Sequence, residues 1–361
     1  SDIRHPSSVQ RIVIIGAGLV GAALAYRLSQ AGASVTVIEA AHPASAASGA
    51  SFGWINASFF HSDAHFNLRA EGIAAHHRLD RDLGDTGTQW PGTLWWEEEG
   101  PALDTQAETL RNLGYRVETL SHNQITAREP LLSAPDRCLF LPDEGAVDAA
   151  HLTHRLLSAA NAPVWRGTPV RGIETVQGRV TGVRLDQGSV IADQVILAAG
   201  TACAGLLAPL GLTLPMLHRP GLILRTKPVA ARITHILASP VQEVRQDPQG
   251  RLIAPLAASH QSDTTEVIPS LPGDLAIAAM MRLGALLPGI ALTLGDVTLA
   301  HRPVPGDNLP AIGPTGIPGL SLAVMHSGVT LTAIVAELVT AEVLTGANSP
   351  LLASFRPTRF F

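Results

Sequence analysis

The chain contains little cysteine and lysine, and each shortage excludes a class of protein. Its 361 residues include two cysteines, Cys138 and Cys203, which lie far apart and lack the spacing of metal ligands. A disulfide framework is therefore not expected, and a reducing compartment is the default. Lys227 is the only lysine, no basic run occurs, and the net charge is −5. This balance gives no reason to expect nucleic acid as a partner.

Long uncharged apolar runs are also missing, although 46% of the residues are apolar and 15% are charged. The strongest candidate, residues 328–345, is interrupted by Glu337 and Glu342 and is predicted to be a buried helix. The first ten residues lack the charged and apolar regions of a signal peptide. We therefore expect a cytoplasmic protein. Peripheral attachment to the inner face of a membrane, or a homo- or hetero-oligomer, stays compatible with this composition.

Three glycines near the amino end form a pattern typical of a dinucleotide-binding turn. An apolar strand over residues 11–15 leads into Gly16, Gly18 and Gly21, and a helix and a second strand follow. Gly16 permits a tight turn, Gly18 lets backbone approach a pyrophosphate, and Gly21 lets the helix pack closely. The amino end of the helix offers free N–H groups to phosphates. The second strand ends at Glu39, which is placed to bind ribose hydroxyls.

The rest of the chain divides into recognisable segments. Residues 44–53 are small and suit a loop that passes close to a ligand, whereas residues 215–299 are predicted to form antiparallel strands with Pro and Gly turns. Histidines cluster between residues 61 and 77, but no carboxylate or cysteine completes a ligand set, so no metal site is predicted. The further predicted helices are 63–83, 102–113, 123–129, 149–160 and 328–345, and the further predicted strands include 92–96, 179–185, 193–201, 221–226, 251–255 and 295–302.

Several segments together resemble one family. These are the 16–39 fingerprint, the small-residue loop 47–51, the strand 195–200, and the two carboxyl-terminal segments 302–313 and 326–332. In order and spacing they are similar to the flavin-dependent amine oxidoreductases of the D-amino-acid oxidase, glycine oxidase and sarcosine oxidase type. The resemblance covers nearly the whole chain, and the last two segments are its most specific part.

The resemblance implies an α/β protein with a Rossmann-like FAD-binding domain and a second, antiparallel-sheet substrate domain. Its length of 361 residues also favours two domains. FAD is favoured over NAD because a second nucleotide-contacting strand and a returning terminal helix suit a longer cofactor. We expect non-covalent binding, since the terminal segment has no cysteine and Gly53 stands where some relatives carry a histidine. The expected domains are 1–85, 142–215 and 296–361 for FAD, and 86–141 and 216–295 for substrate.

The fingerprint and the resemblance together assign residues to the cofactor. At the start of the last helix, backbone N–H groups would stabilise negative charge at the N1/O2 edge of the flavin. The assigned residues are Gly16, Ala17, Gly18, Leu19, Val20, Gly21, Glu39, Ala40, Ser45, Ala46, Ala47, Ser48, Ala50, Ser51, Phe52, Val170, Ala199, Gly200, Gly328, Val329, Thr330 and Leu331.

For the substrate, Arg302 is the leading residue, because it matches the family's carboxylate-binding arginine in an Arg-Pro motif and a guanidinium holds a carboxylate bidentately. His326 could bind substrate or accept a proton near neutral pH. His218 and His260 are weaker candidates. One departure stands out: glycine oxidase-like proteins place a further arginine two positions after the histidine, where this chain has Ser327 and Gly328. The carboxylate clamp is therefore thinner than in those relatives.

The resemblance implies oxidation of the C–N bond of a small amine or amino acid (a D-, N-methyl or imino acid). A hydride would pass to flavin N5, the imine would hydrolyse to an oxo product, and oxygen or a quinone-type acceptor would reoxidise the cofactor. Two alternatives stay open. The same cation and hydride geometry would serve a 2-hydroxy acid, and the thin clamp is compatible with an electron-relay subunit of a larger amine dehydrogenase complex.

Overall fold

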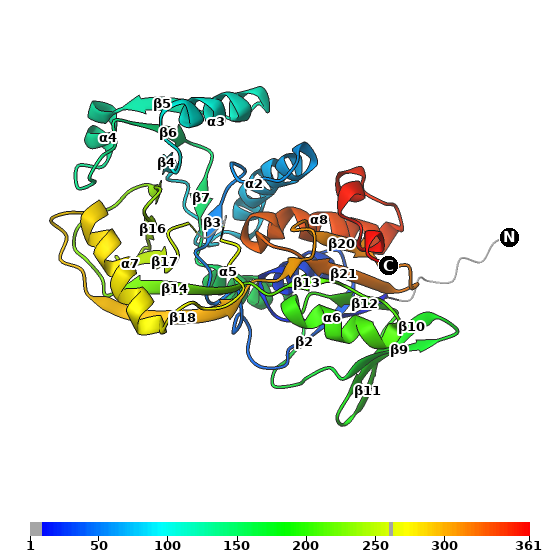
Figure 1. The fold of residues 1–361 in the computed structure, drawn as a ribbon. Helices are drawn as coiled ribbons and strands as arrows, with labels where there is room; N and C mark the ends of the chain where they lie inside the picture. The colour runs from blue at the N-terminus through cyan, green and yellow to red at the C-terminus, as the bar shows by residue number, and fades with distance from the viewer. Residues whose placement is uncertain (1–8, 260–262) are drawn as a thin grey trace.

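A six-stranded sheet holds the fingerprint at its centre (Figure 1). The computed structural model describes residues 9–259 and 263–361. The central strand pairs in parallel with a strand on each side, and the whole sheet is parallel except for one edge strand, β20. In spatial order its strands are β20 (Ala311–Pro314), β21 (Leu320–Val324), β12 (Gln194–Leu197), β1 (Arg11–Ile15), β2 (Ser34–Ile38) and β8 (Val164–Trp165).

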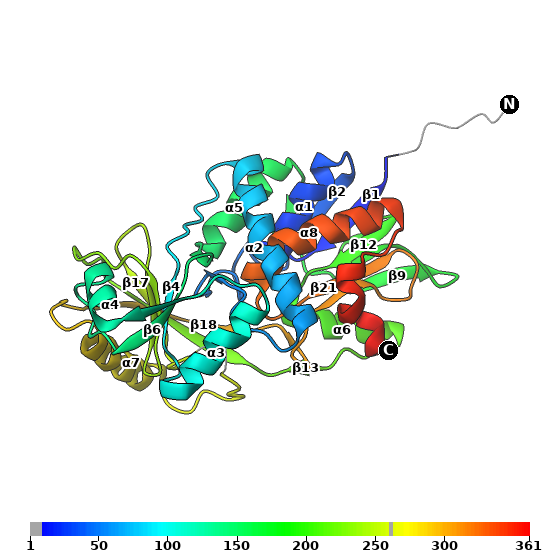
Figure 2. The same ribbon diagram turned by 90° about the horizontal axis from the view of Figure 1, so that it is seen from above.

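Helices α1 (Leu19–Gln30), α5 (Ala149–Ala160), α8 (Gly328–Thr345) and α2 (Asp63–Leu83) cover one face of this sheet. Figure 2 shows α8 lying between α1 and α2, and both neighbours contact it along its length. By length and composition alone α8 could cross a membrane, but its side chains are mostly buried against these neighbours. The helix expected over 328–345 thus belongs to the core.

The opposite face of the sheet is covered by a three-stranded meander and a short helix. Side chains from both pack with the strands in a separate apolar cluster. The covering elements are β9 (Gly172–Val176), β10 (Arg179–Leu185), β11 (Gly188–Ile191) and α6 (Cys203–Leu207), which is flanked by 3-10 turns at Gly200–Ala202 and Ala208–Leu210.

An eight-stranded sheet forms the second half of the molecule, together with three helices (Figure 1). In spatial order its strands are β18 (Leu294–His301), β14 (Pro220–Thr226), β17 (Leu252–Pro255), β16 (Glu243–Gln246), β15 (Ile236–Ala238), β4 (Thr93–Trp95), β6 (Arg137–Leu141) and β5 (Glu118–Ser121). The helices are α3 (Gly100–Asn112), α4 (His122–Arg128) and α7 (Pro272–Leu286).

Two short ladders connect the halves. One pairs β3 (Trp54–Ile55) with β7 (Gly145–Ala146), and the other pairs β13 (Met216–Leu217) with β19 (Val304–Pro305). The chain closes with two 3-10 turns, Pro350–Phe355 and Pro357–Arg359.

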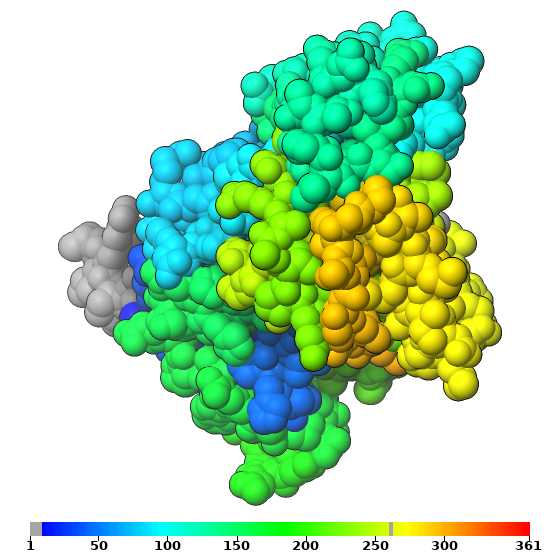
Figure 3. Space-filling view, turned by 90° about the vertical axis from the view of Figure 1, so that its left-hand side faces the viewer, coloured from blue at the N-terminus to red at the C-terminus, as the bar shows by residue number. Residues whose placement is uncertain are grey.

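The structure differs from the sequence predictions at three places in the second half. Residues 215–299 are not all strands, because 272–286 form α7, with Pro272 in its first turn, where proline is favoured. The sheet is not wholly antiparallel, since β4 and β15 pair in parallel. Residues 296–301 belong to β18 and therefore pair within the second sheet, whereas the expected boundary cut this strand. Figure 3 shows the yellow α7 segment on the molecular surface.

Candidate FAD and substrate site

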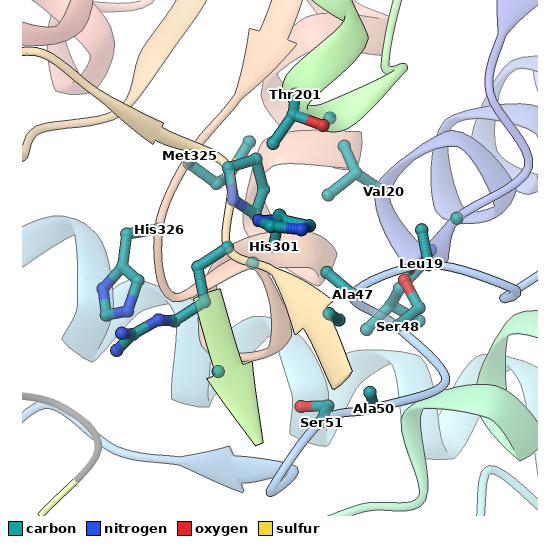
Figure 4. Close-up of a pocket in the computed structure, with 18 of the residues that line it drawn as sticks. Leu19, Val20, Ala47, Ser48, Ala50, Ser51, Thr201, His301, Met325 and His326 are labelled. Atoms are coloured by element: carbon teal, nitrogen blue, oxygen red, sulfur yellow. Dashed lines mark hydrogen bonds between the residues drawn. The ribbon is translucent and has the colours of Figure 1, made fainter. Parts of the chain in front are cut away.

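A cavity of about 900 Å³ is lined by residues from both large sheets. The β1–α1 turn, the end of β2, the 46–54 loop and the end of β12 line one part of it, and β14, β18 and the start of α8 line another. Figure 4 shows this arrangement: Leu19 and Val20 of α1 face the cavity from one side, and Met325 and His326 face it from the other.

The turn between β1 and α1 depends on two glycines, because a side chain at either position would force the neighbouring backbone to move. Gly16 has φ +106°, and a Cβ built on it would lie 2.5 Å from the carbonyl oxygen of Ala198. A Cβ on Gly21 would collide with the Gly16 carbonyl. Helix α1 therefore approaches the strand more closely than an alanine would allow, as the fingerprint predicts.

Glu39 and Ser48 tie the turn to its neighbours. The Glu39 carboxylate accepts hydrogen bonds from the backbone N–H groups of Ala17, at 2.9 Å, and Ala41, at 2.8 Å. The Ser48 hydroxyl accepts from the N–H of Leu19 at 2.9 Å, so it meets an N–H group in the first turn of α1. The small-residue loop thus lies directly over the amino end of this helix.

The start of α8 is held from two sides. Ser327, at φ +59°, precedes the helix in the left-handed conformation. The hydroxyl of Thr330 accepts from the N–H of Asn56, at 3.2 Å, and donates to the carbonyl of Trp54, at 3.3 Å. From α2, the Nε2 atom of His76 lies 2.8 Å from the carbonyl oxygen of Val329. Residues 328–330, the first of α8, line the cavity with their positions set by these contacts.

Most of the cofactor residues predicted from the sequence line this cavity. They are Gly16, Gly18, Leu19, Val20, Glu39, Ala40, Ala46, Ala47, Ser48, Ala50, Ser51, Phe52, Val170, Ala199, Gly200, Gly328, Val329 and Thr330.

Four predicted cofactor residues and one predicted substrate residue are not among the lining residues. Ala17 and Leu331 are fully buried in the core, Gly21 lets α1 pack closely on the strand, and Ser45 is exposed. His218 is also exposed, and its Nδ1 contacts the carbonyl of Glu266. His260 lies outside the described residues.

Arg302 and His326 both line the cavity, and Arg302 is already engaged. Its guanidinium donates to Asp263 Oδ2 at 2.8 Å and to the Pro220 carbonyl at 3.2 Å. Burial lowers the pKa of Arg302, and the Asp263 carboxylate opposes that shift. His326 lies edge-on to the ring of Phe59, with ring centroids 6.4 Å apart. Of the predicted substrate residues, the structure brings these two together at the cavity.

Sequence reasoning missed other polar residues around the cavity, namely Asn56, Arg69, Thr201, Asp263 and His301. Only Arg69 carried a readable signal. It falls on the buried stripe of α2 with Phe66, Ile73 and His76, where a charged side chain is unexpected unless it has a specific role. The others depend on contacts between distant segments.

The residues present fit FAD. The fingerprint turn excludes Cβ atoms, the 46–52 loop carries mostly small side chains, and the first residues of two helices, α1 and α8, line one continuous cavity. Gly16, Gly18 and Glu39 would hold the adenosine and pyrophosphate, and Gly328 to Thr330 would hold the flavin edge. Both cysteines are buried, with the pKa of each thiol raised to about 12 by burial.

Comparison with known proteins agrees with this site. Residues 11–342 match the family described as FAD dependent oxidoreductase, DAO. The chain is 25% identical to an opine oxidase subunit of Agrobacterium tumefaciens over 97% of both chains. It is 26% identical to glycine oxidase of Pseudomonas aeruginosa, covering 88% of this chain and 89% of that one. The solved glycine oxidase of Geobacillus kaustophilus shares the fold, with a TM-score of 0.86 at 22% identity over 98% of this chain and 100% of that one.

The fold, the glycine turn at the cavity and the family match over nearly the whole chain lead to one conclusion. The chain belongs to the DAO family and is an FAD-dependent oxidoreductase of the amino acid oxidase and dehydrogenase type.

Proposed function

We propose that the protein oxidises the C–N bond of a small amine that carries a carboxylate, such as a D-, N-methyl or imino acid. The observation that carries this proposal is the partly buried guanidinium of Arg302 in the wall of the FAD cavity. A planar guanidinium can hold a carboxylate through two parallel hydrogen bonds. The names of the relatives, a glycine oxidase and an opine oxidase, support the same substrate class.

In this proposal the protein acts mainly by positioning. Bound FAD supplies the acceptor for the hydride that leaves the carbon next to nitrogen, and the imine product hydrolyses to an oxo compound. Arg302 orients the carboxylate, and Leu222, Ile223 and Leu256 give the wall beside it an apolar surface that excludes water. His326 stands where it can accept the proton that the amine loses.

The test is an anaerobic absorbance screen of the purified flavoprotein. D- and L-amino acids, N-methyl amino acids, imino acids, hydroxy acids and amines without a carboxylate would each be added, and bleaching of the visible flavin band followed. We expect bleaching by one class of carboxylate-bearing amine. Bleaching only by amines that lack a carboxylate, or only by hydroxy acids, would contradict the proposal. Admitting air then distinguishes oxygen from a quinone-type acceptor.

A second candidate is a flavin-binding component of a larger amine dehydrogenase complex. The opine oxidase relative matches this chain over 97% of both lengths, and its name describes one subunit of an assembly. The described surface also exposes Leu271, Ile277 and Met281 on and beside α7, and exposed apolar clusters mark interaction sites. Copurification of a second chain, together with no bleaching by any compound when this chain is alone, would favour this candidate.

A further inference from the structure

Arg69, on α2, is a fully buried cation beside the cavity. Its side chain has no exposed surface. One terminal nitrogen donates to the hydroxyl of Ser327 at 2.5 Å, and the other donates to the side-chain oxygen of Asn56. The guanidinium also lies 5.9 Å from the ring centroid of Phe59. Both hydrogen-bond partners are neutral and line the cavity.

This guanidinium has no ion-pair partner in the part of the chain that the structure describes. Glu144 is near enough to act on Arg69 electrostatically, but no carboxylate oxygen lies within 4.0 Å of it among the described residues. The Nε atom has no hydrogen-bond partner there either. Burial lowers the pKa of Arg69 to about 10, which leaves the group charged at neutral pH. An unpaired buried charge destabilises a fold unless an anion completes its site.

The position of the charge indicates which anion that is. Ser327 immediately precedes α8, whose first residues line the cavity, and the amino end of a helix carries about half a positive charge. Arg69 adds a full charge directly behind this end, in surroundings that screen it poorly. Reduction adds negative charge to the N1–C2=O edge of a flavin, the edge that the start of α8 is expected to face.

We propose that Arg69 is a positioning residue of the FAD site: through Ser327 and Asn56 it fixes the start of α8, and its charge stabilises the reduced cofactor. The inference rests on FAD binding and not on the proposed substrate. The cation that reaches the turn after His326 therefore comes from α2.

The experiment compares purified holoproteins without any substrate. Two quantities are measured: the two-electron midpoint potential of bound FAD, and the dissociation constant of sulfite, which adds negative charge to the flavin when it binds. We expect Arg69→Met to weaken sulfite binding about tenfold or more, because a nearby buried charge is lost. A tenfold loss in the equilibrium constant for two-electron reduction of the flavin corresponds to a midpoint potential lower by about 30 mV. Arg69→Lys keeps the charge and should restore most of both values.

Asn56→Asp is the second variant and covers the case in which Arg69→Met does not fold or bind FAD. It keeps the shape of the side chain and places a carboxylate on the Arg69 guanidinium, so it should reproduce the loss of sulfite affinity and the lower potential. The matched control is Arg245→Met. Arg245 is also buried and also bonded to neutral acceptors, the carbonyls of Phe52 and Val147, but it is not among the residues that line the cavity.

The possible outcomes of these measurements lead to different conclusions about Arg69. Unchanged potential and sulfite affinity in both Arg69→Met and Asn56→Asp would overturn the proposal. Equal shifts in Arg245→Met would also overturn it, because they would show a general effect of losing a buried arginine. A rise in substrate KM alone, with the potential unchanged, would assign Arg69 to the substrate instead. None of these results bears on whether the enzyme oxidises C–N bonds, which the bleaching screen decides.

Discussion

Asp263 holds the residue that we assign to the substrate carboxylate, so replacing it should change affinity in a defined direction. Its Oδ2 atom accepts a hydrogen bond of 2.8 Å from Arg302, and the two side chains are 14% and 16% exposed. A substrate carboxylate that binds Arg302 bidentately must compete with this partner. Asp263→Asn removes the competing charge and keeps the shape of the side chain. We therefore expect carboxylate substrates to bind more tightly to the variant.

The size of the expected change in KM follows from the partial burial of the Arg302–Asp263 ion pair. Exposed ion pairs contribute about 0.2–1 kcal/mol, and breaking buried pairs costs about 3–5 kcal/mol. A pair that is mostly but not fully shielded lies between these limits, at about 1.5 kcal/mol. That energy is no longer lost when substrate binds the variant, so KM for carboxylate substrates should fall about tenfold. KM for amines without a carboxylate should not change, and these amines serve as the internal control.

The assay is steady-state kinetics on the matched pair of substrates, with FAD content equalised between wild type and variant. Two results would refute the reasoning. An unchanged KM for the carboxylate substrate would show that Arg302 does not contact the substrate carboxylate, or that separating Asp263 from Arg302 costs no free energy. A higher KM would show that Asp263 itself binds the substrate, for example through a cationic group.

Three further predictions follow from the site and the core. Arg302→Met should lower kcat/KM for carboxylate substrates at least about a hundredfold, since charge-assisted hydrogen bonds are lost; a smaller effect would argue against the contact. Gly21→Ala places a Cβ against the Gly16 carbonyl and should cost about 1–3 kcal/mol of stability and weaken FAD binding. Gly205→Ala, inside α6 with nothing within 4 Å of the added Cβ, should not lower the melting temperature. Burial, reinforced by a neighbouring glutamate, raises the pKa of Glu97 from 4.5 to about 8. Between these values the folded protein keeps a proton that the unfolded chain has released, so the free energy of unfolding should fall as pH rises through this range. In urea titrations, Glu97→Gln should make that fall smaller.

The nucleotide-binding half could be predicted in detail from local sequence patterns. The predicted helices at 63–83, 149–160 and 328–345 have the bounds of α2, α5 and α8. These segments have clear starts: Ser62 and Asp148 cap α2 and α5 with their side chains. The strands beside them are short and almost wholly apolar, as parallel strands buried on both faces must be.

The second half was harder to predict because its signals conflict. The Pro272–Gly273 pair is a turn signal, although proline is also favoured in the first turn of a helix, where it lies here. Helix α7 exposes Ile277 and Met281, while Ala276, Ala279, Leu283 and Leu286 are buried. Large apolar side chains on the exposed face weaken the amphipathic pattern on which a helix prediction depends. The parallel pairing of β4 with β15 joins segments more than a hundred residues apart in sequence, so no local pattern could indicate it.

The substrate side of the cavity shows the same division between local and distant information. Arg302 and His326 could be named because each sits in a short motif, but the partners that define their chemistry come from elsewhere in the chain. Asp263 reaches Arg302 from the segment before α7, and Arg69 reaches the turn after His326 from α2. A motif therefore predicts which group lies at the site, whereas its neighbours decide whether that group is free to bind, already neutralised, or supported by a second charge. In this enzyme the two arginines are in opposite states: Arg302 is paired with a carboxylate, whereas among the described residues Arg69 bonds only neutral partners. This is why we assign the first to a displaceable substrate anion and the second to the permanent cofactor site.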